Sequence, residues 1–133
     1  MEFNKIGEVK SSFSKAAVPK EMRKKVSEIV IKEEYLKGLK KLEESNYLVV
    51  VFAFHLAKGF DLIGKRRYGG ERGVFASRSP RRPNPIGVTT VKLLAINENI
   101  IKVKGLDAIN RTPVLDIKPY SVDIDTAQNF KKS

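Results

Sequence analysis

Short apolar runs separated by polar turns dominate this chain, and most of the runs have the length of a strand. Residues 47–55 are apolar almost throughout, which predicts a strand buried on both faces. Residues 26–32 are rich in β-branched side chains, which favour strands. Residues 87–96 and 100–106 predict a hairpin that turns at residues 97–99.

One segment, residues 33–44, has a spacing of apolar residues that predicts a helix. Tyr35, Leu36, Leu39 and Leu42 recur there at intervals of three or four residues. The charged residues between them are expected to form a solvated face.

The other segments carry weaker signals. Residues 1–15 alternate loosely and are compatible with an opening strand, and residues 114–117 predict a final strand. We expect an extended turn at residues 16–22, a long mobile loop at residues 58–72 and a frayed tail at residues 126–133.

These elements predict a mostly β protein, a small antiparallel β-barrel with one short side helix. The absence of a βαβ alternation argues against a doubly wound nucleotide-binding fold. Since 133 residues are too few for two domains that each have a core of their own, we expect a single domain over residues 1–125, followed by the tail.

Composition narrows the class of partner. The formal net charge is +11, which favours a polyanionic partner such as nucleic acid. The sequence has no cysteine and one histidine, which argues against a zinc site. No apolar run has the length of a membrane span, and the first residues lack the hydrophobic core of a signal peptide. We therefore expect a soluble protein of the cytoplasm, with no membrane and no metal.

Positive charge is concentrated in one stretch. Six arginines and one acidic residue fall within residues 66–82. Three of the arginines, Arg78, Arg81 and Arg82, alternate with prolines that restrict the backbone. A stiff loop of this kind can present guanidinium groups to a carboxylate or phosphate. A solvated proline-rich turn is the alternative interpretation.

Two long motifs give the chain a recognisable resemblance. GVFASRSPRRPNPIG at residues 73–87 and GLDAINRTPVLDIKPY at residues 105–120 resemble the TrmO-type family, also called TsaA-like or YaeB-like. AVPKE at residues 17–21 and FAFH at residues 52–55 support the match. The resemblance implies a small β-barrel methyltransferase that uses S-adenosylmethionine. It implies N-methylation of threonylcarbamoyladenosine beside the anticodon of tRNA, by a homodimer.

The resemblance also carries cofactor contacts onto residues of this chain. They are Pro19, Lys20, Glu21, His55, Leu56, Arg78, Val88, Ile109, Asn110, Arg111 and Thr112. Ordinary packing is the alternative for Pro19, Leu56 and Val88. The chain departs from the family's usual pattern at Lys20 to Met22 and at Asn110-Arg111, where the family usually has aspartate-glycine.

The remaining arginines exceed what one cofactor carboxylate can use. We expect a cationic rim that grips RNA phosphates, formed by Arg66, Arg67, Arg72, Arg81 and Arg82. Bridges to acidic residues of a neighbouring subunit are the alternative. Asp107 and Asp116 are the carboxylates that could accept a proton from the target nitrogen, or they simply cap a turn. Two rival functions remain open: a non-catalytic RNA-binding barrel, and a methyltransferase acting on a small molecule.

Overall fold

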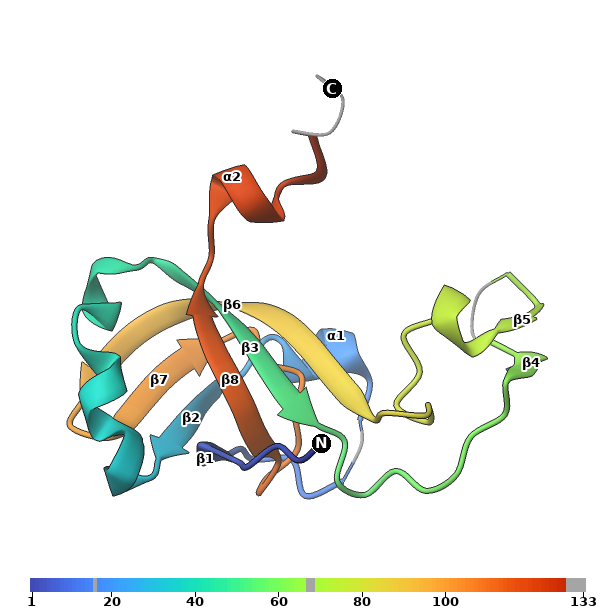
Figure 1. Cartoon of the computed structure of the whole chain (residues 1–133), viewed down its shortest axis with the longest axis horizontal. Coiled ribbons are helices and arrows are strands. Elements are labelled where there is room, and N and C mark those ends of the chain that lie inside the picture. Colours follow the sequence, from blue (N-terminus) through green and yellow to red (C-terminus); the bar gives the residue numbers. More distant parts are fainter. Residues whose placement is uncertain (16, 67–68, 129–133) are drawn as a thin grey trace.

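Six antiparallel strands close into a barrel in the computed structural model, which describes residues 1–15, 17–66 and 69–128 (Figure 1). Around the barrel the order is β1-β2-β7-β6-β3-β8. The strands are β1 (Gly7–Lys10), β2 (Val26–Ile31), β3 (Tyr47–Ala53), β6 (Ile86–Asn97), β7 (Ile100–Lys104) and β8 (Pro113–Pro119). The predicted fold class is therefore confirmed.

The core lies inside the barrel and follows the two-residue period of the strands. Leu48, Val50 and Phe52 of β3 are buried, whereas Tyr47, the first residue of the strand, is 50% exposed. The prediction that this strand is buried on both faces is wrong. Its outward residues are only half buried, because an antiparallel barrel covers just one face of each strand. Their apolar character reflects strand preference.

The predicted helix at residues 33–44 is instead a pair of short 3₁₀ helices, η1 (Glu33–Leu39) and η2 (Leu42–Glu44). Leu36, Leu39 and Leu42 recur every three residues, which is the period of a 3₁₀ helix. Lys41, with φ of 69°, separates the two. Leu39 and Leu42 still pack against the core, as a side helix would.

Two further helical turns occur where no helix is predicted. The expected extended turn contains α1 (Pro19–Met22), which begins with proline at a position that needs no amide donor. Met22 is 3% exposed and fixes this turn to the barrel. After β8, α2 (Val122–Asp125) begins at Ser121, whose Oγ accepts from the Ile124 amide at 3.3 Å. None of the helices in the described ranges is long and apolar enough to cross a membrane.

The long connection between β3 and β6 projects from the barrel as an arm (Figure 1). Within the segment predicted to be a mobile loop, β4 (Ile63–Lys65) and β5 (Glu71–Gly73) form a two-stranded hairpin. The arginine stretch begins with a 3₁₀ turn, η3 (Val74–Ala76). Val74 is buried, and its amide donates to the Leu62 carbonyl at 2.8 Å.

Candidate ligand-binding end of the barrel

Three connections meet at one end of the barrel. Because neighbouring strands are antiparallel, the links β1–β2, β3–β6 and β7–β8 leave and re-enter at the same end. They comprise residues 11–25, 54–85 and 105–112. The candidate cofactor residues all lie in these connections, except Val88, which is the third residue of β6. The fold thus brings together segments that are far apart in sequence.

A carboxylate joins two of the connections to β6. Arg23, just after α1, donates to Asp107 Oδ2 from Nε at 3.2 Å and from a terminal guanidinium nitrogen at 2.9 Å. Thr89 Oγ1 donates to Asp107 Oδ1 at 2.6 Å. Both carboxylate oxygens of Asp107 therefore accept hydrogen bonds, which favours the structural interpretation of this residue over a proton acceptor.

Sequence reasoning missed Arg23 and Thr89. Arg23 and Asp107 are 84 residues apart, so no local pattern indicates the contact. Together the three side chains hold α1 next to the start of β6, and with it the candidates Pro19, Lys20 and Glu21.

The turn at residues 109–112 is fixed to the end of β1. The Asn110 amide donates to the Phe13 carbonyl at 2.6 Å, and Asn110 Oδ1 accepts from the Ser11 amide at 3.1 Å. The Arg111 amide donates to the Val9 carbonyl at 2.7 Å. Arg111 has φ of 69°, where the family's usual glycine would be unstrained.

Thr112 has a role inside this turn. Its side chain is buried, at 2% exposure, and Oγ1 donates to the Ile109 carbonyl at 2.7 Å. A shallow pocket of about 330 Å³ lies beside the turn, lined by Glu8, Val9, Lys10, Val30, Asn110 and Arg111. Leu56, Arg78 and Val88 do not line it. Thr112 thus supports the turn, and Asn110 and Arg111 are the candidates that face a pocket.

Arg78 is held against β6. One of its terminal nitrogens donates to the Val88 carbonyl at 3.1 Å, which leaves the other guanidinium donors for a ligand. Val88 and Leu56 are 44% and 61% exposed, so neither is a packing residue of this chain. His55 is also exposed, so it is not a packing residue of this chain either.

The arginines expected to form a cationic rim differ in what they contact. Arg66 donates to the Asp61 carbonyl and Arg72 to the Ala76 carbonyl, at 3.0 and 3.1 Å. Arg82 is half buried and donates to the Ser77 and Ser79 carbonyls at 3.0 and 3.1 Å. These side chains brace the arm and the loop.

Arg81 is exposed, and its guanidinium has no hydrogen bond or ion pair within the described ranges. Arg67 lies outside the described residues. Arg81 is therefore the arginine of the loop with the most donors available to a partner.

Asp116, the second candidate proton acceptor, contacts Lys118 Nζ at 2.7 Å. Its hydrogen bond and charge raise the pKa of Lys118 above the ordinary value for lysine. Asp116 lies on the outer wall of β8, opposite Val51 of β3. It is an ion-pair partner at the surface, which weakens its candidacy as a base.

The structure is thus a closed antiparallel barrel with an arginine-rich arm, and three of its connections lie at one end. The chain belongs to the family described as the tRNA-methyltransferase O N-terminal domain, whose model matches residues 8–126. The family inferred from the two motifs is thereby confirmed.

Individual relatives agree with this assignment. A probable S-adenosyl-L-methionine-binding protein of Archaeoglobus fulgidus is 42% identical over 135 residues, covering 98% of this chain and 37% of the relative. A tRNA (adenine(37)-N6)-methyltransferase of Mus musculus is 42% identical over 93 residues, covering 68% of this chain and 22% of the relative. The crystal structure of TrmO from Pseudomonas aeruginosa superposes with a TM-score of 0.78 at 28% identity, covering 96% of this chain and 59% of that one. The chain thus spans less than two thirds of each of these relatives.

Proposed function

We propose that this protein binds S-adenosylmethionine at the end of the barrel where the three connections meet. We propose further that it methylates a nitrogen of threonylcarbamoyladenosine beside the anticodon of tRNA. The observation that carries the proposal is the convergence of the candidate residues at that end, with Arg78 held against β6. Two relatives support the cofactor and a tRNA adenine target, since one is a probable S-adenosyl-L-methionine-binding protein and the other a tRNA (adenine(37)-N6)-methyltransferase.

The side chains at this end fit the parts of the cofactor. Arg78 keeps donors for the methionyl carboxylate, and the exposed Leu56 and Val88 offer apolar surface to adenine. Asn110 and Arg111 line the nearby pocket. Asp107 acts indirectly, because it holds α1 and the start of β6 in place.

The chemistry asks little of the protein beyond positioning. When bound, S-adenosylmethionine supplies a methyl group on a positively charged sulfur, so that transfer leaves a neutral thioether and needs no acid for the leaving group. The side chains must hold the attacking nitrogen in line with the methyl carbon and exclude water. The proton lost from that nitrogen can pass to solvent, since both carboxylate candidates are engaged in other contacts.

A second copy of the chain completes the site in this proposal. The arm exposes large apolar side chains, with Leu62 at 61%, Ile63 at 66% and Phe75 at 77%. An isolated two-stranded hairpin is marginally stable in water, so apolar residues exposed on one favour a partner surface. A homodimer would cover these side chains, and it would also cover the exposed surfaces of Leu56 and Val88.

Two measurements test the proposed function. Isothermal titration with S-adenosylhomocysteine should show saturable binding, which a non-catalytic RNA-binding barrel would not give. Nucleoside mass analysis of tRNA incubated with protein and S-adenosylmethionine should then show a gain of one methyl group on the modified adenosine. Cofactor binding without methylation of any tRNA would instead favour a small-molecule substrate.

The dimer is tested separately. Leu62→Glu combined with Phe75→Glu places charges in the proposed interface and should convert a dimer to a monomer in sedimentation. The same variant should lose affinity for S-adenosylhomocysteine. A monomeric parent protein that binds the cofactor normally would refute the two-subunit site.

A further inference from the structure

The outer wall of the barrel carries a row of exposed residues that the proposed cofactor site does not use. Strand register places Tyr47 opposite Lys92, Lys92 opposite Lys104, and Lys104 opposite Val26. All four residues are exposed. Neighbouring strands lie about 4.8 Å apart, so the backbone from Tyr47 to Lys104 spans about 10 Å.

The two lysines in this row lack a counter-charge. Like charges directly opposite each other on neighbouring strands are destabilising. In the part of the chain that the structure describes, neither Lys92 nor Lys104 forms an ion pair. Lys5 and Lys118, in contrast, each contact a carboxylate. An anion bound across Lys92 and Lys104 would remove their repulsion.

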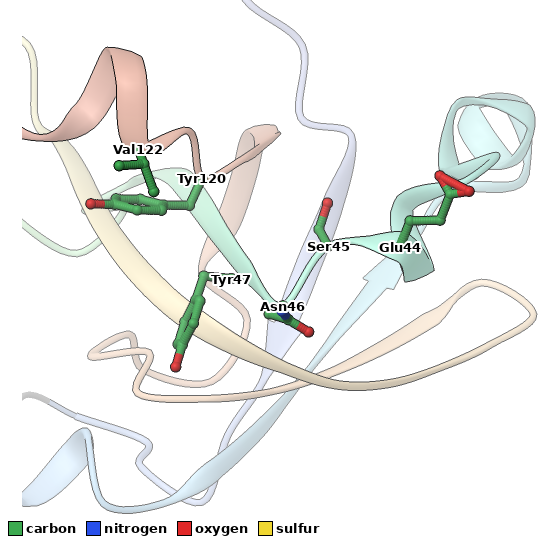
Figure 2. Close-up of a pocket in the computed structure, with 6 residues that line it drawn as sticks. All are labelled: Glu44, Ser45, Asn46, Tyr47, Tyr120 and Val122. Atoms are coloured by element: carbon green, nitrogen blue, oxygen red, sulfur yellow. The ribbon is translucent and has the colours of Figure 1, made fainter.

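A pocket with aromatic walls adjoins the row at Tyr47. It has a volume of about 470 Å³ and is lined by Glu44, Ser45, Asn46, Tyr47, Tyr120 and Val122. The Tyr120 amide donates to the Tyr47 carbonyl at 2.9 Å, which holds the two strand ends together. In Figure 2 both tyrosine rings lie on one side of Asn46, and Ser45 and Glu44 lie on the other.

We propose that Tyr120, Tyr47, Lys92 and Lys104 form a second RNA-binding surface, here called the tyrosine–lysine strip. An unpaired base stacks on Tyr47 at the pocket, and the adjoining phosphates lie on the two lysines. The choice of RNA rests on the proposed function, since tRNA is the expected substrate. The combination of an aromatic face with neighbouring cations is also what single-stranded nucleic acids require.

The pocket itself suits a base better than a phosphate. Glu44 would repel a phosphate, but it can accept a hydrogen bond from the amino group of a base, and Asn46 can donate or accept. The strip is separate from the arginine loop. Lys92 lies six positions along β6 from Ile86, which is beside the loop, and this corresponds to about 20 Å. One folded RNA can reach both.

The first test measures the salt dependence of RNA binding. The probes are tRNA and a twelve-nucleotide single-stranded RNA, and the variant is Lys92→Gln with Lys104→Gln. Loss of two phosphate contacts should lower the slope of log affinity against log salt by about 1.4, at about 0.7 per contact. The matched control is Lys5→Gln with Lys102→Gln, which removes the same charge from lysines near Glu8 and Glu28. An equal effect of both double variants would mean that net charge alone acts, and the strip would be rejected.

The second test separates stacking from charge. Tyr47→Ala should weaken binding of either RNA by about 5- to 150-fold without changing the salt slope. Tyr47→Phe keeps the ring and should bind like the parent protein. Because Tyr47 is half exposed, both variants should fold, which thermal melting and binding of S-adenosylhomocysteine will verify.

The outcomes separate this proposal from the proposed function. A parent protein that binds RNA but methylates no tRNA would remove the function and leave the strip to be judged by its variants. A parent that methylates tRNA, with strip variants that bind both RNAs normally, would remove the strip alone. A parent that binds neither RNA would remove both.

Discussion

Arg23 donates two hydrogen bonds to a single oxygen of Asp107, across 84 residues of sequence. The other oxygen accepts from Thr89. The Asp107 side chain is 15% exposed and that of Arg23 is 56% exposed, so the carboxylate is the more buried partner. This contact fixes the first connection against the third and explains why Asp107 is a positioning residue.

Removing the carboxylate should therefore affect stability more than chemistry. Asp107→Ala leaves the Thr89 hydroxyl and Arg23 without an acceptor and should lower the free energy of unfolding by about 1–3 kcal/mol. Arg23→Ala removes only the exposed partner and should cost about 0.2–1 kcal/mol. Urea unfolding of both variants and of the double variant measures the coupling.

Asp107→Asn separates positioning from base catalysis. It keeps the shape of the side chain and an acceptor oxygen, so methyl transfer should fall by less than about 10-fold. Loss of a general base typically costs 10²–10⁴-fold. A loss of kcat in that higher range, with normal affinity for the cofactor, would assign Asp107 to catalysis after all.

Arg78 provides the most direct test of the cofactor site. Arg78→Ala should weaken binding of S-adenosylhomocysteine by about 10- to 150-fold, because a charge-assisted hydrogen bond contributes about 1.5–3 kcal/mol. Arg78→Lys keeps the charge but loses the planar fork, and should recover only part of the affinity. Arg72→Ala is the matched control, since Arg72 is an exposed arginine of the arm whose side chain donates to the Ala76 carbonyl and not to β6. Equal affinities of parent and Arg78→Ala would move Arg78 to RNA binding or structure.

Gly87 is a packing requirement at the start of β6. A Cβ atom at this position would lie 2.6 Å from Cζ of Phe52 and 2.8 Å from Cζ of Phe54. These rings contact each other edge to face, with centroids 5.3 Å apart, and Phe52 is buried in the core. Gly87→Ala should therefore destabilise the barrel by about 1–3 kcal/mol, measurable by urea unfolding. Gly38→Ala, with no atom within 4 Å of the added Cβ, is the control that should not destabilise.

The strands were predictable because their signals are local. The β-branched run at residues 26–32 and the hairpin around residues 97–99 need only neighbouring residues to be recognised, and both are present. Residues 33–44 differ from the predicted α-helix because a spacing of three fits both helix types, and Gly38 disfavours an α-helix there.

The candidate site was predictable only through the family motifs. Positions such as Arg78 and Val88 come from the resemblance, and the structure adds the hydrogen bond between them. The contact of Arg23 with Asp107 depends on barrel closure, so the residues that neighbour either of them in the sequence do not reveal it. Likewise, the burial of Thr112 follows from how the turn packs on β1, which composition does not encode.

The two adjacent arginines of the proline-rich loop should behave differently in tRNA binding. Arg82 is half buried and bonded to two carbonyls of its own loop, whereas Arg81 is exposed, so Arg81 is the one expected to contact phosphate. Arg81→Ala should leave cofactor affinity and stability unchanged and reduce the salt slope of tRNA binding by about 0.7. Arg82→Ala should also loosen the loop and thus lower the melting temperature. Because Arg78 lies in the same loop, the affinity for the cofactor should fall as well. Filter binding across a salt series, with sedimentation of each variant, measures both effects. Unchanged slopes together with a shift from dimer to monomer would mean that these arginines bridge subunits, and direct phosphate contact would then be abandoned.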